Sequence, residues 1–284
     1  MRNPHQIIAD KILAALKTGD LPWIKPWASK PMGLPKNAST GRAYSGANVI
    51  LLWITQEERG YSSDKWLTLK QANAMGGKVR KGEVSTMITF VSRFDKQDDA
   101  GNVASIPFLK TFPVFNVEQC EGLNLEAAAP LAINADERDA ACDAFIAATG
   151  AVISHGGERA FYRPSADNIQ LPAWERFTDR AGYYATALHE LVHWTGHESR
   201  CARDFGKRFG DNAYAAEELV AELGAAFLCA ELGIDAVTQH AAYIQHWIKL
   251  LEGDPRAFMT AASKASSAVE FLRSKQVSQE LAAA

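Results

Sequence analysis

The decisive stretch of this 284-residue chain is Tyr184-Ala-Thr-Ala-Leu-His-Glu-Leu-Val-His193. On an α-helix, residues four positions apart project from the same face, so His189 and His193 would bring two imidazoles within reach of one zinc ion. Glu190 lies beside them, and its carboxylate can accept a proton from an attacking water molecule and later return it. The spacing therefore predicts a zinc site of the His-Glu-x-x-His kind on a buried helix, with Glu190 as general base.

A catalytic zinc also needs a third protein ligand and an open coordination position. His197 continues the four-residue series, but Gly196 would end or loosen the helix before it. The distal histidine of the longer His-Glu-x-x-His-x-x-Gly-x-x-His pattern would fall on Ser199, which disfavours that variant. We therefore expect the third ligand further along the chain.

The better source of this ligand is the segment Tyr214-Ala-Ala-Glu-Glu-Leu-Val-Ala-Glu222, whose small residues would allow close packing on the zinc helix. Glu218 and Glu222 share one face, in the gluzincin-type arrangement where the first carboxylate binds zinc and the second orients a ligand histidine. We expect these two roles for Glu218 and Glu222. Glu217 points about 100° away around the helix and would be solvated. A register error of one residue would exchange the roles, so Glu217 and Glu222 remain alternative ligands.

Other residues near the two predicted helices bear on catalysis. Tyr214 lies one turn before Glu218, where its hydroxyl could hydrogen-bond the oxyanion of a tetrahedral intermediate; a packing tyrosine at a helix start is the alternative. The segment Asn168-Ile-Gln-Leu-Pro172 is typical of an edge strand, which could pair with the main chain of an extended peptide. We expect Arg200 and Arg203 to hold the loop after the zinc helix or to pair with the clustered glutamates.

The N-terminal half interleaves aromatic and cationic residues. Residues 1–125 carry 16 Lys and Arg against 11 Asp and Glu, whereas the remainder carries 14 against 22. A protein surface that binds single-stranded nucleic acid needs this mixture, because bases stack on aromatic rings while cationic side chains contact the phosphates. The candidate contacts are Trp23, Lys25, Trp27, Lys36, Arg42, Tyr44, Lys70, Lys78, Arg80 and Lys81. Scattered lysines also occur on ordinary solvated surfaces, so composition alone leaves the DNA role open.

The change of charge coincides with an Ala- and Pro-containing stretch at residues 126–136, which we interpret as a linker. It divides the chain into a first domain at residues 1–125 and a second at residues 137–284. With these two domains, the chain as a whole would have an α+β fold. The absence of a long apolar run and of a signal-peptide-like start predicts a cytoplasmic protein without a membrane partner. Four cysteines without a Cys-x-x-Cys pair speak against a cysteine zinc ribbon.

Periodicity indicates the elements of each domain. The first domain is expected to be mixed α+β, with helices at residues 7–16, 46–56 and 70–75 and strands at residues 84–91 and 108–117. The second is expected to be mainly helical, with helices at residues 137–149, 182–194, 214–232, 235–251 and 255–275 and a small sheet from residues 160–163 and 168–172.

The chain resembles the ArdC-type antirestriction proteins of conjugative plasmids, which are related to the N-terminal region of TraC primases. The resemblance spans nearly the whole chain. Its first half rests on Leu21-Pro-Trp-Ile-Lys-Pro-Trp27, Thr40-Gly-Arg-Ala-Tyr-Ser-Gly-Ala-Asn48, Trp66-Leu-Thr-Leu-Lys-Gln-Ala-Asn73 and Gly77-Lys-Val-Arg-Lys-Gly-Glu83. Its second half rests on His189-Glu-Leu-Val-His-Trp-Thr-Gly-His197 and on the segment from Tyr214 to Glu222. The resemblance implies a single-stranded-DNA-binding domain joined to a zincin-like metallopeptidase domain, together protecting incoming plasmid DNA from host restriction.

The sequence thus favours a protein that binds single-stranded DNA and holds Zn²⁺ with His189, His193 and Glu218. Two alternatives stay open. In one, the metal only stabilises the fold, and protection comes from coating DNA or docking on a restriction enzyme. In the other, the chain is a regulatory zinc protease that cleaves a protein substrate and has no DNA role.

Overall fold

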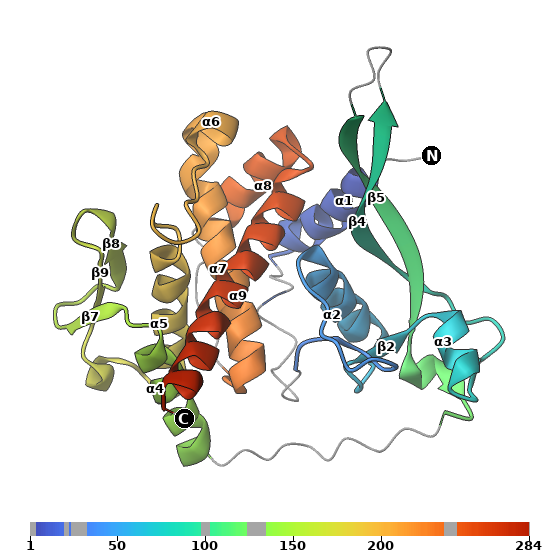
Figure 1. Cartoon of the computed structure of the whole chain (residues 1–284), viewed down its shortest axis with the longest axis horizontal. Coiled ribbons are helices and arrows are strands. Elements are labelled where there is room, and N and C mark those ends of the chain that lie inside the picture. The colour runs from blue at the N-terminus through green and yellow to red at the C-terminus, as the bar shows by residue number, and fades with distance from the viewer. Residues whose placement is uncertain are drawn as a thin grey trace. The chain divides into compact units, whose positions relative to one another are not determined.

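A computed structural model of the chain describes residues 4–19, 23, 33–97, 103–123, 135–235 and 243–283. These form two compact units, which we describe separately (Figure 1). Unit 1 contains residues 1–8 and 35–127, and unit 2 contains residues 9–34 and 128–284. The α+β class expected from the sequence is confirmed. Residues 9–34, which the change of charge places in the first domain, belong to unit 2.

In its described residues, unit 1 combines small sheets with the helices α2 and α3 and the first residues of α1 (Pro4–Lys17). Its elements are β1 (Lys36–Asn37), α2 (Ala47–Arg59), β2 (Lys65–Leu67), α3 (Leu69–Ala74), β3 (Lys78–Val79), β4 (Thr86–Gln97), β5 (Val103–Asn116), the 3-10 turn η1 (Val117–Gln119) and β6 (Cys120–Glu121). The larger sheet has the order β1-β2-β5-β4, and β3 pairs with β6. The two strands expected at residues 84–91 and 108–117 are present in longer form as β4 and β5, which pair antiparallel with Thr86 opposite Val114.

The core of unit 1 lies between α2 and the sheet. Leu52 of α2 packs with Trp66, Ile88 and Val114 of three strands. Asn48 also ties the helix to the edge strand β4, since its amide donates to the Thr89 carbonyl and its oxygen accepts from the Thr89 N–H, both at 2.8 Å. This side chain therefore satisfies main-chain groups that an edge strand would otherwise leave to water.

Unit 2 is mainly helical, as predicted. Its elements are α4 (Ala135–Ala148), β7 (Val152–His155), β8 (Phe161–Arg163), η2 (Pro164–Ala166), β9 (Asn168–Leu171), η3 (Trp174–Arg176), α5 (Arg180–Trp194), α6 (Gly206–Phe209), η4 (Gly210–Asn212), α7 (Ala213–Leu232), α8 (Ile244–Gly253) and α9 (Ala257–Ala283). Most of α1 (Pro4–Lys17) also belongs to it. Among the described residues of both units, no helix is long and apolar enough to cross a membrane.

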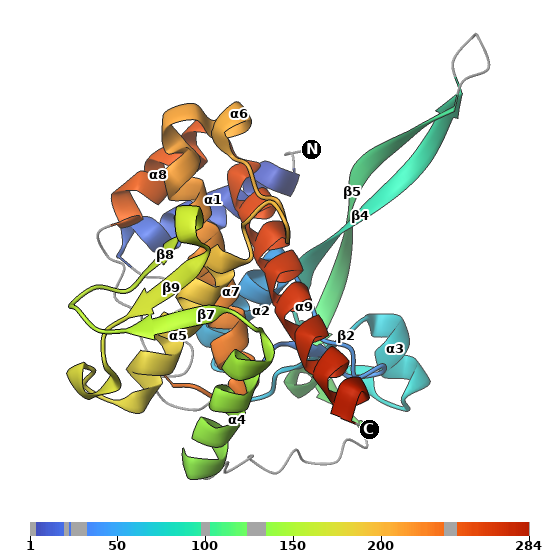
Figure 2. The same cartoon turned by 60° about the vertical axis from the view of Figure 1, so that its left-hand side comes forward.

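The small sheet corrects one prediction. Its order is β7-β9-β8, with β9 parallel to β7 and antiparallel to β8. The segment that we expected at an edge is therefore the central strand, and β8 is an edge strand beside α5 (Figure 2). Pro172 does not prevent this, because it follows the last paired residue, Leu171, and removes no hydrogen bond from the ladder.

The N-terminal segment joins unit 2 through its apolar side chains. Ile12 and Leu16 of α1 are buried, and the Trp23 ring packs against Trp247 and Phe258 with ring centroids 5.7 and 6.2 Å away. Trp23 is only 1% exposed. Its prediction as a DNA contact is therefore wrong, because the ring contributes to a core instead of presenting a face to bases.

The close approach of α5 and α7 organises unit 2. α5 begins at the N-cap Asp179, whose side chain accepts from the Gly182 N–H at 2.7 Å. α7 is buried along most of its length and packs against both α5 and α9 (Figure 2). At the crossing, a Cβ atom on Gly224 would lie 2.8 Å from Cγ2 of Val192. Glycine therefore sets how near the two helix backbones can lie.

Gly224→Ala is expected to destabilise the protein, because its methyl group would overlap Val192 in a packed interface. Overpacking costs about 1–3 kcal/mol, which outweighs the roughly 1 kcal/mol that alanine gains over glycine within a helix. Urea denaturation measures the change. Gly253→Ala is the matched control, because its Cβ would meet no atom within 4 Å. It should be neutral or stabilising, and equal stabilities of the two variants would contradict the packing argument.

Candidate metal centre

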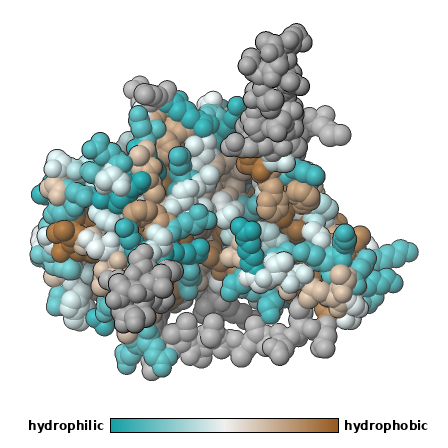
Figure 3. Space-filling view, viewed as in Figure 1, coloured by the Kyte–Doolittle hydropathy of each residue, from teal (hydrophilic) through white to brown (hydrophobic). Residues whose placement is uncertain are grey.

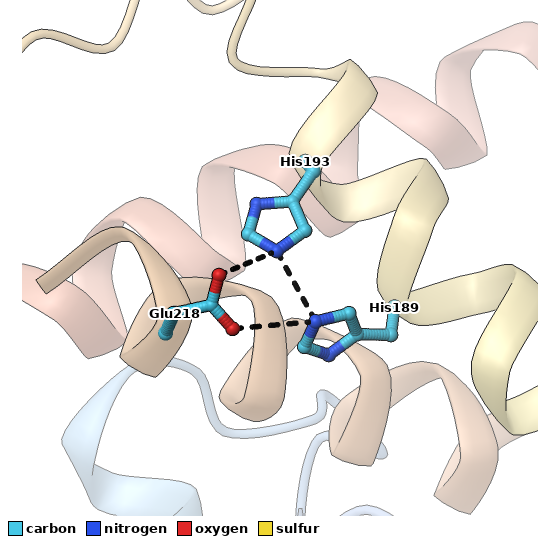
Figure 4. Close-up of side chains that lie close together, drawn as sticks. All are labelled: His189, His193 and Glu218. Atoms are coloured by element: carbon cyan, nitrogen blue, oxygen red, sulfur yellow. Dashed lines mark hydrogen bonds and ion pairs between the residues drawn. The ribbon is translucent and has the colours of Figure 1, made fainter. Parts of the chain in front are cut away.

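The histidines of α5 and a glutamate of α7 converge on one point (Figure 4). His189 Nε2 lies 3.1 Å from His193 Nε2, and the Glu218 carboxylate oxygens lie 3.7 Å and 3.4 Å from these two atoms. One ligand atom from each of the three residues lies within 4.8 Å of the others. Tetrahedral zinc ligands at about 2.0–2.2 Å from the ion are roughly 3.3–3.6 Å apart, so the arrangement fits a shared divalent ion.

The contacts distinguish Glu218 from the two alternative ligands. Glu222 Oε1 lies 4.0 Å from Nδ1 of His189, and Glu217 Oε1 lies 3.2 Å from Nδ1 of His193. Both carboxylates thus face the outer nitrogen of a histidine, whereas Glu218 faces the Nε2 atoms of both. Glu218 is the one of the three that is placed to share an ion with the histidines.

Local electrostatics also suit a cation. Although burial lowers the pKa of His193, hydrogen bonds with Glu217 and Glu218 raise it to about 10. The surrounding carboxylates therefore favour positive charge at this place, and a divalent ion meets the same requirement. Two imidazoles and one carboxylate, without a thiolate, form a donor set that zinc and other first-row divalent ions accept.

Glu217 is not solvated as we predicted. Its carboxylate lies between His193 and Arg203, whose Nε and Nη2 donate to its two oxygens at 3.0 and 2.6 Å. Burial raises the pKa of Glu217, but the hydrogen bonds from these two residues outweigh it and hold the pKa below the usual value. The helical wheel correctly separates Glu217 from Glu218, yet it carries no information about a partner from another segment.

The site opens into a cavity of about 710 Å³. Glu190 lines this cavity next to the histidines, and Tyr214 stands at the start of α7 with its hydroxyl 3.1 Å from that of Tyr243. Tyr214 is 64% exposed, and its ring centroid lies 6.0 Å from that of Tyr243. Phe161 and Tyr162 of β8 also line the cavity, so an edge strand borders it after all.

Arg200 fastens that strand to the end of the zinc helix. Its guanidinium lies 3.9 Å from the centroid of the Trp194 ring and donates to the Trp194 carbonyl at 2.6 Å. It also donates to both oxygens of Asp167 and to the Tyr162 hydroxyl. The structural role expected for Arg200 is therefore confirmed, and its contacts position β8 relative to α5.

The remaining DNA candidates differ in their exposure. Those with exposed side chains are Lys36, Arg42, Lys70, Lys78, Arg80 and Lys81, of which Arg80 forms an ion pair of 2.6 Å with Glu83. Tyr44 is half-buried against the core, where burial raises its pKa. Lys25 and Trp27 lie outside the residues that the structure describes.

Sequence reasoning missed an exposed ring on the hairpin. Phe90 of β4 is 48% exposed, and its ring centroid lies 5.5 Å from that of Phe112, over which the Lys110 ammonium is placed at 5.1 Å. Hydrophobic residues reach the surface in this part of unit 1 (Figure 3). The alternation of the strand was visible in the sequence, but not which of its faces is covered.

Two family models match the chain. Residues 2–115 match the N-terminal domain of the anti-restriction factor ArdC, and residues 140–264 match a zincin-like metallopeptidase domain. The metal-free crystal structure of the antirestriction protein ArdC from plasmid R388 is 39% identical and has a TM-score of 0.85, over 98% of this chain and 99% of that one. The Mn(II)-bound structure of that protein is 41% identical with a TM-score of 0.81, over 97% and 98%.

Longer relatives match as well. Two DNA primases TraC from Escherichia coli are 41% and 38% identical over 94% and 97% of this chain, which spans 20% and 28% of their lengths. An uncharacterised protein of Sinorhizobium fredii is 34% identical over 96% of this chain and 92% of its own length. The zincin-like domain implies a metal ion, and the Mn(II)-bound relative leaves open which ion it is.

Asp167→Asn is expected to weaken the Arg200 contacts in a pH-dependent manner. The hydrogen bond from Arg200 is the main cause that holds the pKa of Asp167 at about 2, below its usual 3.8. The resulting stabilisation is complete above the usual pKa and is lost as the pH falls through about 2. The urea midpoints of wild type and variant should thus differ by a constant amount above about pH 5 and converge only as the pH falls through about 2. In an Arg200→Met background, the same substitution should have a smaller pH dependence, because only the Tyr162 hydroxyl and His197 then lower the pKa of Asp167. A gap that persists at low pH would contradict the ionic origin.

Proposed function

The chain belongs to the ArdC family of antirestriction proteins, and we propose that it binds single-stranded DNA with unit 1 and a catalytic divalent metal ion with unit 2. In this way it would protect plasmid DNA that enters a recipient cytoplasm from host restriction. The observation that carries the proposal is the convergence of His189, His193 and Glu218 at the wall of a cavity.

We assign these three residues as ligands of Zn²⁺, for which the donor set and its spacing are suitable. An ion held there supplies Lewis-acid chemistry, in that it polarises a carbonyl group and activates water for attack. Glu190 is the proton carrier. Its carboxylate is buried beside His189 and borders the cavity, so it can take a proton from the attacking water and pass it to the leaving amine.

Tyr214 is assigned a supporting role in the same reaction. Tyr214 lines the cavity, and the hydrogen bond with Tyr243, together with burial, raises the pKa of its hydroxyl. The hydroxyl therefore keeps its proton at neutral pH and can donate a hydrogen bond to the oxyanion of a tetrahedral intermediate. Glu222, buried on α7, would orient His189 through Nδ1.

An extended polypeptide is the substrate that the surroundings of the site fit best. β8 is an edge strand of its sheet and offers main-chain groups for pairing, while its Phe161 and Tyr162 side chains border the cavity. A peptide added alongside β8 would pass close to Glu190. This assignment moves the substrate strand from β9, which the sequence pattern favours, to β8.

For the DNA role, the described residues of unit 1 offer exposed cations and an exposed aromatic ring. The side chains of five candidate cations are exposed: Lys36, Arg42, Lys70, Lys78 and Lys81. The Phe90 ring could stack with a base, and Lys110 beside it could contact a phosphate. Arg80 contributes less, because Glu83 already neutralises its charge.

The double variant His189→Ala/His193→Ala is expected to lose its metal, and Glu190→Gln is expected to keep it. Metal content after purification, measured by emission spectroscopy, checks both. An equimolar ion that persists in the double variant would disprove the ligand assignment. Peptide hydrolysis by Glu190→Gln should fall about 10²–10⁴-fold, because the proton carrier is gone.

Plasmid protection measured beside these assays separates the enzyme from a pure binding module. Loss of protection in Glu190→Gln, with metal and fold retained, would support a role for hydrolysis. Full protection by that variant would instead support the alternative in which the protein acts by covering DNA or by docking on a restriction enzyme.

Arg42→Ala/Lys70→Ala is expected to weaken binding to a single-stranded oligonucleotide and to make it less dependent on salt. Each phosphate that the variant no longer neutralises should reduce the slope of log affinity against log salt by about 0.7.

Phe90→Ala should weaken the binding free energy for the oligonucleotide by about 1–3 kcal/mol and leave the salt slope unchanged. Lys249→Ala, an exposed lysine of unit 2, is the control. Wild-type protein without salt-dependent binding would favour a protease with no DNA role.

A further inference from the structure

Each histidine of the candidate metal centre has a carboxylate of α7 at its outer nitrogen, but the two pairs differ. Glu222 Oε1 lies 4.0 Å from Nδ1 of His189, in a fully buried position. Glu217 Oε1 lies 3.2 Å from Nδ1 of His193, within hydrogen-bond distance. Glu217 is also bound by a cation from a third segment, Arg203, and this additional contact requires an explanation.

Arg203 lies in the loop after α5, and its guanidinium donates hydrogen bonds to several groups of α5 and α7. Its side chain is 1% exposed, and its Nε and Nη2 donate to both oxygens of Glu217 at 3.0 and 2.6 Å. Its guanidinium also donates to the Val192 carbonyl at 2.6 Å and to the Thr195 hydroxyl. One buried cation thus joins the last turn of α5 to the carboxylate that faces His193.

The loop between them is shaped to admit this guanidinium. The Arg203 N–H donates to the Gly196 carbonyl at 3.0 Å, which folds the loop back onto the end of α5. A Cβ atom on Gly196 would lie 2.8 Å from Arg203 Nη2 and 3.0 Å from the His193 carbonyl oxygen. A side chain at position 196 would therefore displace the guanidinium from its place behind His193.

We propose that Glu217 is a positioning residue for His193 and that Arg203 holds Glu217 in place. The inference rests on the proposed function, since it takes His193 as a metal ligand. By accepting the Nδ1–H of His193, the carboxylate fixes the ring and its tautomer, with the Nε2 lone pair directed at the ion. The two hydrogen bonds from Arg203 fix the carboxylate in turn and keep it from turning inward as a competing ligand.

Metal affinity is the quantity that this arrangement controls. Full-length protein freed of metal is titrated with Zn²⁺ against a chromophoric chelator, which reports the Kd without reference to hydrolysis. Glu217→Ala is expected to raise the Kd about 10–100-fold, the usual effect of removing a carboxylate that supports a ligand histidine. Glu217→Gln, which retains an acceptor oxygen, should recover part of the loss.

Arg203→Met should also raise the Kd, but only while Glu217 is present. Because Arg203 acts through Glu217, the double variant Arg203→Met/Glu217→Ala should bind Zn²⁺ no more weakly than Glu217→Ala. Arg200→Met is the matched control. It removes a guanidinium from the same loop, one that contacts Asp167 and Trp194 and has no contact with Glu217 among its hydrogen bonds in the described residues. It should lower the thermal stability with little change in Kd.

The outcomes separate this inference from the function on which it rests. A wild-type Kd in Glu217→Ala, or equal effects of Arg203→Met and Arg200→Met, would overturn the positioning role. Zn²⁺ bound by His189→Ala/His193→Ala as tightly as by wild type would instead overturn the metal site itself. Circular dichroism of the metal-free variants confirms that each compared protein is folded.

Discussion

The contact between α5 and α7 at Gly224 is the constraint on which the rest of unit 2 depends. Without a side chain at this position, the α7 backbone lies against Val192, only one residue from His193. The histidines of one helix and Glu218 of the other can then meet across the interface. A wider separation would leave the same residues on facing helices without a common point, because side chains of fixed length span a limited distance.

This close packing also gathers negative charge in a place with little water. Glu190, Glu218 and Glu222 are each less than a tenth exposed, and Glu217 is close by. Burying a carboxylate is costly unless it is hydrogen-bonded or neutralised. Arg203 and the imidazoles supply part of the compensation, and a divalent ion at the convergence point would supply more. The cluster is thus better explained as a binding site than as a device for stability.

The sequence was informative where the determining interactions are local. The His-Glu-x-x-His spacing and the four-residue step from Glu218 to Glu222 depend on helix geometry alone, and the structure places these side chains on facing helices. Three other features depend on distant partners. Trp23 is buried by residues more than 200 positions away, Glu217 is held by Arg203 from a loop, and the central place of β9 follows from strand order. Composition and periodicity contain none of this information.

The membership of residues 9–34 in unit 2 affects how the protein can be assembled and taken apart. On the ribosome this early segment is made before residues 35–127 of unit 1, and the Trp23 ring can be covered only after Trp247 and Phe258 have been synthesised. All of unit 1 is therefore synthesised while a tryptophan that belongs to the other unit still lacks its ring partners. Proteolytic cleavage at one site after unit 1 would not separate the two units cleanly, since the amino-terminal fragment would still contain part of the core of unit 2. The metal-binding unit is in this sense a product of both ends of the chain.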